Sequence, residues 1–138
     1  MATQILDTLA KISKTYKNAI PYKKYNLSEN EYKVLSALYE LGAVNSFAYL
    51  KEKVKLHDSQ ISVLLSGLNT KGFVVRKKSD NDRRSVDMKI TEEGAQAMHS
   101  LKAEMEALEE KLTKLLGEEN AAQYIELSNT LSKAFKTK

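Results

Sequence analysis

At 138 residues and a formal net charge of +4, the chain is most simply one modestly basic domain with a thin hydrophobic core. It has no cysteine, which excludes disulfide bonds, a thiolate nucleophile and a cysteine-based redox switch. The N-terminal residues lack a signal-peptide core and no apolar run is long enough to span a membrane, so we expect a soluble cytoplasmic protein that does not contact a membrane.

The first predicted element is an amphipathic helix over residues 1–20, which ends at or before Pro21. Its apolar side chains recur at spacings of four and three, with lysines between them: Ile5, Leu9, Ile12, Tyr16 and Ala19. A second helix is predicted to begin after Ser28, where Ser28 and Glu31 have the spacing of a reciprocal capping box. Gly42 is placed to end this second helix.

Two further helices follow, a short one at about 46–54 and a longer one over about 58–71, separated by the break "KLHD". The longer helix has an apolar face formed by Ile61, Leu64, Leu65 and Leu68. Its opposite face carries short hydroxyl side chains, which approach base edges closely. We therefore take Ser59, Ser62 and Ser66, with Gln60 at the entry turn, as candidates for reading DNA bases, against the alternative of a merely solvated face.

After Gly72 the apolar period changes to two, which predicts a two-stranded hairpin with arms fixed by Phe73, Val75, Val86, Met88 and Ile90. Residues 71–84 hold six basic and two acidic residues, whereas residues 92–119 hold three lysines and eight glutamates. This contrast predicts that the hairpin meets an anion. An alternative is a lysine-rich edge that prevents strand-to-strand aggregation. The candidate phosphate-binding residues are Arg76, Lys77, Lys78, Arg83 and Arg84.

Within that hairpin we expect Arg84 to enter a DNA minor groove, where negative potential is focused, while the lysines meet phosphates. Asp82, two positions earlier, is expected to brace the arginine or the loop. A long helix then begins after Thr91, with a nearly heptad seam, and a last helix begins at about 118. The apolar residues of these two helices include Met98, Leu101, Met105, Leu108, Leu112, Leu115, Tyr124, Leu127 and Leu131.

The motif Asp82, Arg83, Arg84, followed by a strand and by Thr91 and Gly94, resembles the MarR family of bacterial winged helix-turn-helix transcription regulators, as does nearly the whole chain. The resemblance implies a single domain of mainly α structure with a small β-hairpin wing. It places a winged helix-turn-helix lobe at 28–91, with the wing at 73–90, and dimerisation helices at 1–20 and 92–138. The residues expected at the homodimer interface are Ile5, Leu9, Leu108, Leu112, Leu115, Leu127 and Leu131.

The chain departs from the family at two positions. Val63 stands where many members carry an arginine that reads guanine, and Lys51 stands where many carry an alanine. Val63 is therefore expected to pack on a thymine methyl group. The family also implies a pocket for a small aromatic ligand near Tyr16, Tyr22, Tyr25 and Tyr32, although tyrosines at helical spacing also serve as core.

We expect no enzyme activity, because the phosphate-loop, metalloprotease and nucleophile-elbow motifs are absent. With only His57 and His99 as histidines, we expect no metal and no other cofactor. The predicted function is a homodimeric regulator, expected to repress, that binds a pseudo-palindromic double-stranded operator. The alternative is a dimeric helical interaction protein whose basic hairpin binds an acidic protein partner.

Overall fold

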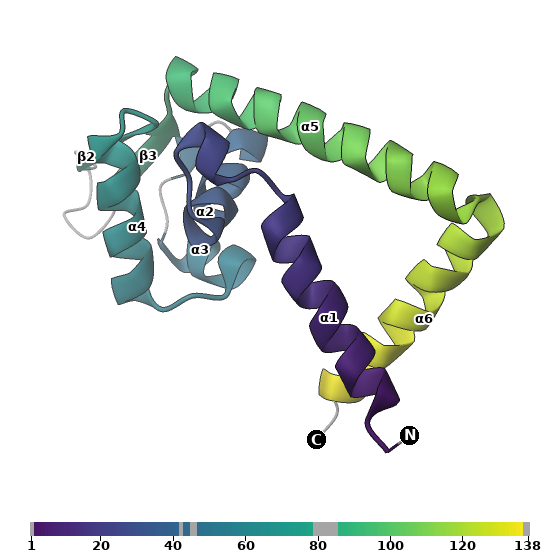
Figure 1. Ribbon diagram of the computed structural model, residues 1–138. Helices are drawn as coiled ribbons and strands as arrows, with labels where there is room; N and C mark the ends of the chain where they lie inside the picture. Colours follow the sequence, from purple (N-terminus) through teal and green to yellow (C-terminus); the bar gives the residue numbers. More distant parts are fainter. Residues whose placement is uncertain (1, 42, 45–46, 79–85, 137–138) are drawn as a thin grey trace. The chain divides into compact units, whose positions relative to one another are not determined.

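The computed structural model describes residues 2–41, 43–44, 47–78 and 86–136 (Figure 1). The chain forms two compact units, Met1–Leu101 and Lys102–Lys138. The helices are α1 (Gln4–Ala19), α2 (Glu29–Leu41), α3 (Phe47–Val54), α4 (Asp58–Thr70), α5 (Glu92–Leu116) and α6 (Glu118–Lys136), with a short 3-10 turn, η1 (Lys23–Tyr25). The strands are β1 (Ala43–Val44), β2 (Val74–Lys78) and β3 (Val86–Ile90). The predicted fold class, mainly α with a small β-hairpin, is confirmed.

The core of the first unit lies where α2, α3 and α4 pack together beside the strands (Figure 1). The predicted apolar face of α4 is confirmed, because Ile61, Leu65 and Leu68 are fully buried and Leu64 is half-buried. The same core receives Val34, Leu35 and Leu38 from α2, Leu50 from α3, Met88 from β3, and Met98 and Leu101 from α5. Burying this face of α4 fixes which residues its opposite face exposes.

The predicted capping box at the start of α2 is present. The Glu31 amide donates to Ser28 Oγ at 3.1 Å, and the Ser28 amide donates to Glu31 Oε1 at 2.9 Å. Two of the amides at the helix start thus have partners, which stabilises α2 at its entry. The helix ends at Leu41, and Gly42, the residue expected to end it, lies outside the described residues.

The sheet has three strands in the order β1-β3-β2, one more than the sequence predicted. Both pairings of β3 are antiparallel, with Val44 opposite Met88 on one side and Arg76 opposite Met88 on the other. Val75 was expected to help fix a hairpin arm, but the buried residue of this arm is Val74, whereas 52% of Val75 is exposed. Strand β2 therefore presents Val74 and Arg76 to the side of Met88, since alternate residues share one face.

The junction between β3 and α5 depends on Thr91 and Gly94. Thr91 Oγ1 accepts from the Gly94 amide at 3.0 Å, as predicted for a helix cap, and it also donates to the Gly72 carbonyl at 2.6 Å. A Cβ atom on Gly94 would collide with the carbonyl oxygen of Phe73. The Thr-x-x-Gly spacing therefore ties the start of α5 to the chain that enters the hairpin.

The helices at the two ends of the chain leave apolar side chains exposed. In α1 no residue is buried, and Ile5 and Ile12 are exposed while Leu9 is half-buried. In the second unit, α6 also buries no residue. Throughout the part of the chain that the structure describes, every helix is too short or too polar to cross a membrane.

Candidate nucleic-acid interface

The exposed face of α4 carries all five residues that the sequence assigned to base reading. Ser59, Gln60, Val63 and Ser66 are exposed and Ser62 is half-buried. Val63 is 71% exposed, although its neighbours Ile61 and Leu65 are fully buried. An aliphatic side chain left on a face of hydroxyl groups offers an apolar contact to whatever α4 meets.

The first turn of α4 uses one of these candidates for its own structure. Gln60 Oε1 accepts from the backbone amide of His57 at 3.0 Å, so this oxygen caps the helix. Lys51 Nζ of α3 lies 3.8 Å from Asp58 Oδ1, an exposed pair that adds little stability. Gln60 therefore presents its amide nitrogen, a donor, more readily than its oxygen.

Strand β2 and α4 are joined at the candidate interface by Arg76 and Ser66. Arg76 Nη1 donates to Ser66 Oγ at 3.1 Å, which brings a predicted phosphate-binding residue against a predicted base-reading residue. Because of this hydrogen bond, the Arg76 and Ser66 side chains belong to one continuous surface. Lys77 and Lys78 lie on β2, with side chains outside the described residues, and Asp82, Arg83 and Arg84 lie outside them entirely.

A half-buried ion pair joins α2 to Lys71, the residue that follows α4. Lys71 Nζ lies 2.8 Å from Glu31 Oε1 and donates to the Asn26 carbonyl at 2.7 Å. A Cβ atom on Gly67 would lie 3.1 Å from Glu31 Oε2, so the glycine leaves the carboxylate its place beside α4. Sequence reasoning counted Lys71 with the basic hairpin, but its ammonium group is engaged inside the lobe.

This arrangement also fixes the charge of Glu31. Burial by itself would raise the pKa of the carboxyl, but hydrogen bonds from Lys71 and Ser28 outweigh burial and hold the pKa below its ordinary value. Glu31 therefore remains an anion paired to Lys71. The capping box was a signal for Glu31, whereas no local pattern links it to a lysine 40 residues away.

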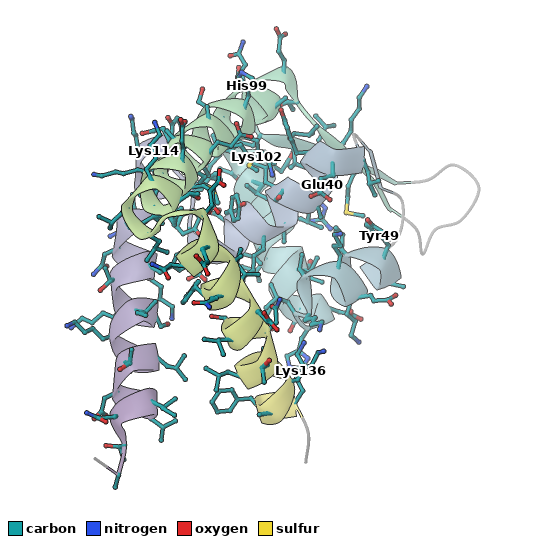
Figure 2. The ribbon with its side chains drawn as sticks, turned by 90° about the vertical axis from the view of Figure 1, so that its right-hand side faces the viewer. Glu40, Tyr49, His99, Lys102, Lys114 and Lys136 are labelled. Carbon is teal, nitrogen blue, oxygen red and sulfur yellow. The ribbon has the colours of Figure 1, made fainter. Side chains whose placement is uncertain are left out.

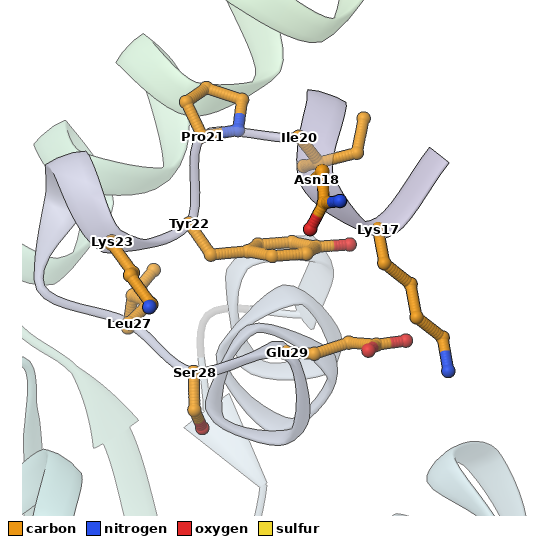
Figure 3. A pocket seen from close by; sticks show the side chains of 9 residues that line it. All are labelled: Lys17, Asn18, Ile20, Pro21, Tyr22, Lys23, Leu27, Ser28 and Glu29. Atoms are coloured by element: carbon orange, nitrogen blue, oxygen red, sulfur yellow. The ribbon is translucent and has the colours of Figure 1, made fainter. Parts of the chain in front are cut away.

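Of the four tyrosines proposed for a ligand pocket, Tyr22 lines one pocket of the described part of the chain and Tyr32 lines another. A pocket of about 430 Å³ is lined by Tyr22 together with Lys17, Asn18, Ile20, Pro21, Lys23, Leu27, Ser28 and Glu29 (Figure 3). Tyr16, Tyr25 and Tyr32 do not belong to its lining. The rings of Tyr22 and Tyr32 have centroids 5.2 Å apart, and burial, together with the Tyr16 side chain, raises the pKa of Tyr22.

The residues expected at a dimer interface lie on α1, α5 and α6. In the first unit Ile5 is exposed and Leu9 half-buried, and in the second unit Leu112, Leu115 and Leu127 are exposed while Leu108 and Leu131 are half-buried. Apolar faces of this extent are typical of surfaces that another chain covers.

The described residues contain no group of three metal-binding side chains. One of the two histidines, His99, is exposed on α5 (Figure 2).

Comparisons with known proteins agree on one family. A family model described as a winged helix DNA-binding domain matches residues 31–110, more than half of the chain. The transcriptional regulator PecS of Dickeya dadantii is 28% identical over 94 residues, which cover 65% of this chain and 57% of PecS. The chain thus matches little more than half the length of that relative.

Solved structures share the fold across almost the whole chain. A mutant of MarR from E. coli complexed with operator DNA has a TM-score of 0.74 at 22% identity. The match covers 94% of this chain and 95% of the MarR chain. NadR in complex with 4-hydroxyphenylacetate has a TM-score of 0.66 at 22% identity. The match covers 100% of this chain and 94% of the NadR chain. The matching family model is that of a DNA-binding domain and PecS is a transcriptional regulator, which agrees with the expectation that the chain is not an enzyme.

Proposed function

The chain belongs to the winged-helix DNA-binding family, as a transcription regulator of the MarR type, and on that premise we propose that it is a homodimeric repressor of a pseudo-palindromic operator. The observation that carries the proposal is the Arg76–Ser66 hydrogen bond of 3.1 Å, which joins the hairpin to the exposed face of α4. A surface of short hydroxyl groups with a guanidinium at its edge suits base edges flanked by phosphates.

In this proposal α4 lies in the major groove, and the hairpin follows the phosphate backbone. Ser59, Ser62 and Ser66 meet base edges, because their short side chains let the helix backbone approach closely. Lys77, Lys78 and Arg83 meet phosphates, Arg84 enters the minor groove, and Asp82 braces the loop that presents it. Arg76 contributes charge near the backbone and orients Ser66 through their hydrogen bond.

The proposed dimer buries the apolar faces of α1, α5 and α6 against a second copy. Exposed Ile5, Leu112 and Leu127 support this, because a stable monomer would leave these side chains in water. Two recognition helices related by a two-fold axis then enter major grooves about one helical turn apart. Blocking the polymerase from such a site gives repression.

We also propose that a small aromatic acid regulates the protein from the pocket that Tyr22 lines. Figure 3 shows the Tyr22 ring in the pocket, with the side chains of Lys17 and Asn18 at its hydroxyl end. Apolar lining from Ile20 and Leu27 suits a ring, and the lysine suits a carboxylate. 4-Hydroxyphenylacetate, the ligand of NadR, is the probe. Binding measured by calorimetry should weaken in Lys17→Met, and no heat with the wild type would refute this site.

Salt titration separates the proposed function from its rival. Fluorescence anisotropy should show binding to duplex DNA that weakens log-linearly with salt, because counterions are released from phosphates. Arg84→Ala should weaken binding and lower the slope by about one unit, with the oligomeric state unchanged in sedimentation. If duplex DNA does not bind at low salt and an acidic polypeptide does, the basic hairpin serves a protein partner instead.

A further inference from the structure

A shallow surface pocket of the first unit lies between the start of α2 and the first half of α4. It has a volume of about 320 Å³ and is lined by Asn30, Ser59, Gln60, Val63 and Leu64. Asn30 comes from the first turn of α2, where it is exposed, and it did not figure among the sequence candidates. The lining thus combines two amides, one hydroxyl and two aliphatic side chains, and it contains no arginine or lysine.

That combination matches the major-groove edge of one kind of base pair. Adenine presents N7 as an acceptor and N6 as a donor, a pair that an asparagine or glutamine amide matches with two hydrogen bonds. Thymine in the same pair presents a methyl group, which an aliphatic side chain contacts. A guanine is best read by the two N–H groups of an arginine, which this lining does not supply.

The hydrogen bonds of α4 decide which amide reads adenine. Gln60 Oε1 already accepts from the His57 amide at 3.0 Å, so this side chain is poorly placed to donate and accept at once. Asn30 has both an oxygen and an amide nitrogen to offer. Val63 stands beside it, 71% exposed, and supplies the apolar contact.

We propose that the side chains of this shallow pocket read one A·T pair in each half-site, with Asn30 on the adenine edge and Val63 on the thymine methyl group. The inference rests on the proposed function, because it requires α4 to face the major groove. It adds to that function a base identity and a specificity residue, Asn30, that lies on a different helix from the other candidates. It also accounts for an exposed aliphatic side chain on an otherwise polar helix face.

Base analogues test this proposal atom by atom. A duplex selected from a random pool is remade with single thymines replaced by deoxyuridine, which removes only the methyl group. The wild type should lose about fourfold in affinity at one thymine of a half-site, and about fifteenfold when both half-sites are changed, because each buried methyl group is lost. Replacing the paired adenine by 7-deazaadenine should cost about fivefold through the loss of N7.

Two variants and a matched control assign these losses to side chains. Val63→Ala should bind thymine and uracil duplexes within twofold of each other, and Asn30→Ala should become insensitive to 7-deazaadenine. Val75→Ala removes the same two methyl groups from another exposed valine, on β2, and should keep both sensitivities. Because Val63 and Asn30 are exposed, neither variant should alter the circular dichroism spectrum.

The outcomes separate this inference from the function on which it rests. Suppose that duplexes bind with a defined motif. If replacing thymine by uracil then lowers the affinity less than twofold at every position, or if Val63→Ala still discriminates fully between thymine and uracil, the shallow pocket does not read thymine. A guanine–cytosine pair required at the position nearest Val63 would overturn it equally. If no duplex binds at all, the regulator proposal fails first, and an acidic or apolar protein partner would be the occupant of this surface.

Discussion

The ion pair between Glu31 and Lys71 should make a measurable contribution to the stability of the DNA-binding lobe. Glu31→Gln keeps an oxygen that accepts from the Ser28 amide but removes the charge that attracts Lys71. Lys71→Met removes the cation and leaves the carboxylate, whose side chain is 11% exposed, without its partner. The two variants therefore test the pair from opposite sides.

The expected magnitudes follow from the geometry. A charge-assisted hydrogen bond exceeds a neutral one by about 1 kcal/mol, so Glu31→Gln should lower the free energy of unfolding by about 1–2 kcal/mol. Removing one partner of a fully buried pair costs about 3–5 kcal/mol. Because 27% of the Lys71 side chain is exposed, solvent screens part of this, and Lys71→Met should cost about 2–3 kcal/mol. The coupling energy in the double mutant should be about 1–2 kcal/mol.

The pH dependence has a definite sign. The pKa of Glu31 is lower in the folded state than in the unfolded chain, so its contribution is complete above the ordinary carboxyl pKa and is lost as the pH falls through the lowered value. Urea unfolding followed by circular dichroism at about pH 7 and about pH 4 measures this. The stability difference between wild type and Glu31→Gln should shrink on acidification.

An exposed pair elsewhere in the chain supplies the control. Lys114 and Glu110 of α5 lie 3.2 Å apart, with 76% and 69% of their side chains exposed. Glu110→Gln should change the free energy of unfolding by less than about 0.5 kcal/mol at either pH. The reasoning is refuted if Glu31→Gln behaves like Glu110→Gln, or if the coupling energy between Glu31 and Lys71 is zero within error.

Arg76→Ala should weaken DNA binding about tenfold in anisotropy. Arg76→Lys should restore only part of this binding, because lysine supplies the charge without the planar guanidinium that reaches Ser66. Full binding by Arg76→Lys would show that the charge of Arg76, and not its hydrogen bond to Ser66, accounts for the loss. Leu108→Glu with Leu112→Glu should yield monomers in sedimentation, and a product that is still dimeric would refute this placement of the interface. Gly94→Ala should lower the free energy of unfolding by about 1–3 kcal/mol through the clash with the Phe73 carbonyl, and unchanged urea unfolding would contradict that contact.

Features set by neighbouring residues could be predicted from the sequence. The capping box at Ser28, the buried face of α4 and the cap at Thr91 each depend on spacings of three or four residues, and all three are present. The same periodicity placed the exposed face of α4 and therefore the candidate base-reading residues. Local hydrogen bonds and amphipathic patterns carry enough information for these elements.

Features set by distant partners could not be predicted in this way. Strand β1 has two residues, too few for a period, and forms because β3 offers it an edge. Val74, not Val75, faces inward because the register of β2 against β3 fixes the alternation. The contact of Lys71 with Glu31, and the pocket that Asn30 lines together with residues of α4, join segments whose proximity only the folded lobe defines.

Selection of bound duplexes from a random pool tests the central claim most directly. The account predicts a pseudo-palindromic motif whose half-sites are centred about 10–10.5 base pairs apart, or a multiple of that spacing, because two recognition helices of a two-fold dimer read successive major grooves. Each half-site should contain the A·T pair assigned to Asn30 and Val63. A pool that returns without enrichment, or an asymmetric motif bound by one copy of the chain, would contradict a homodimeric regulator of a palindromic operator.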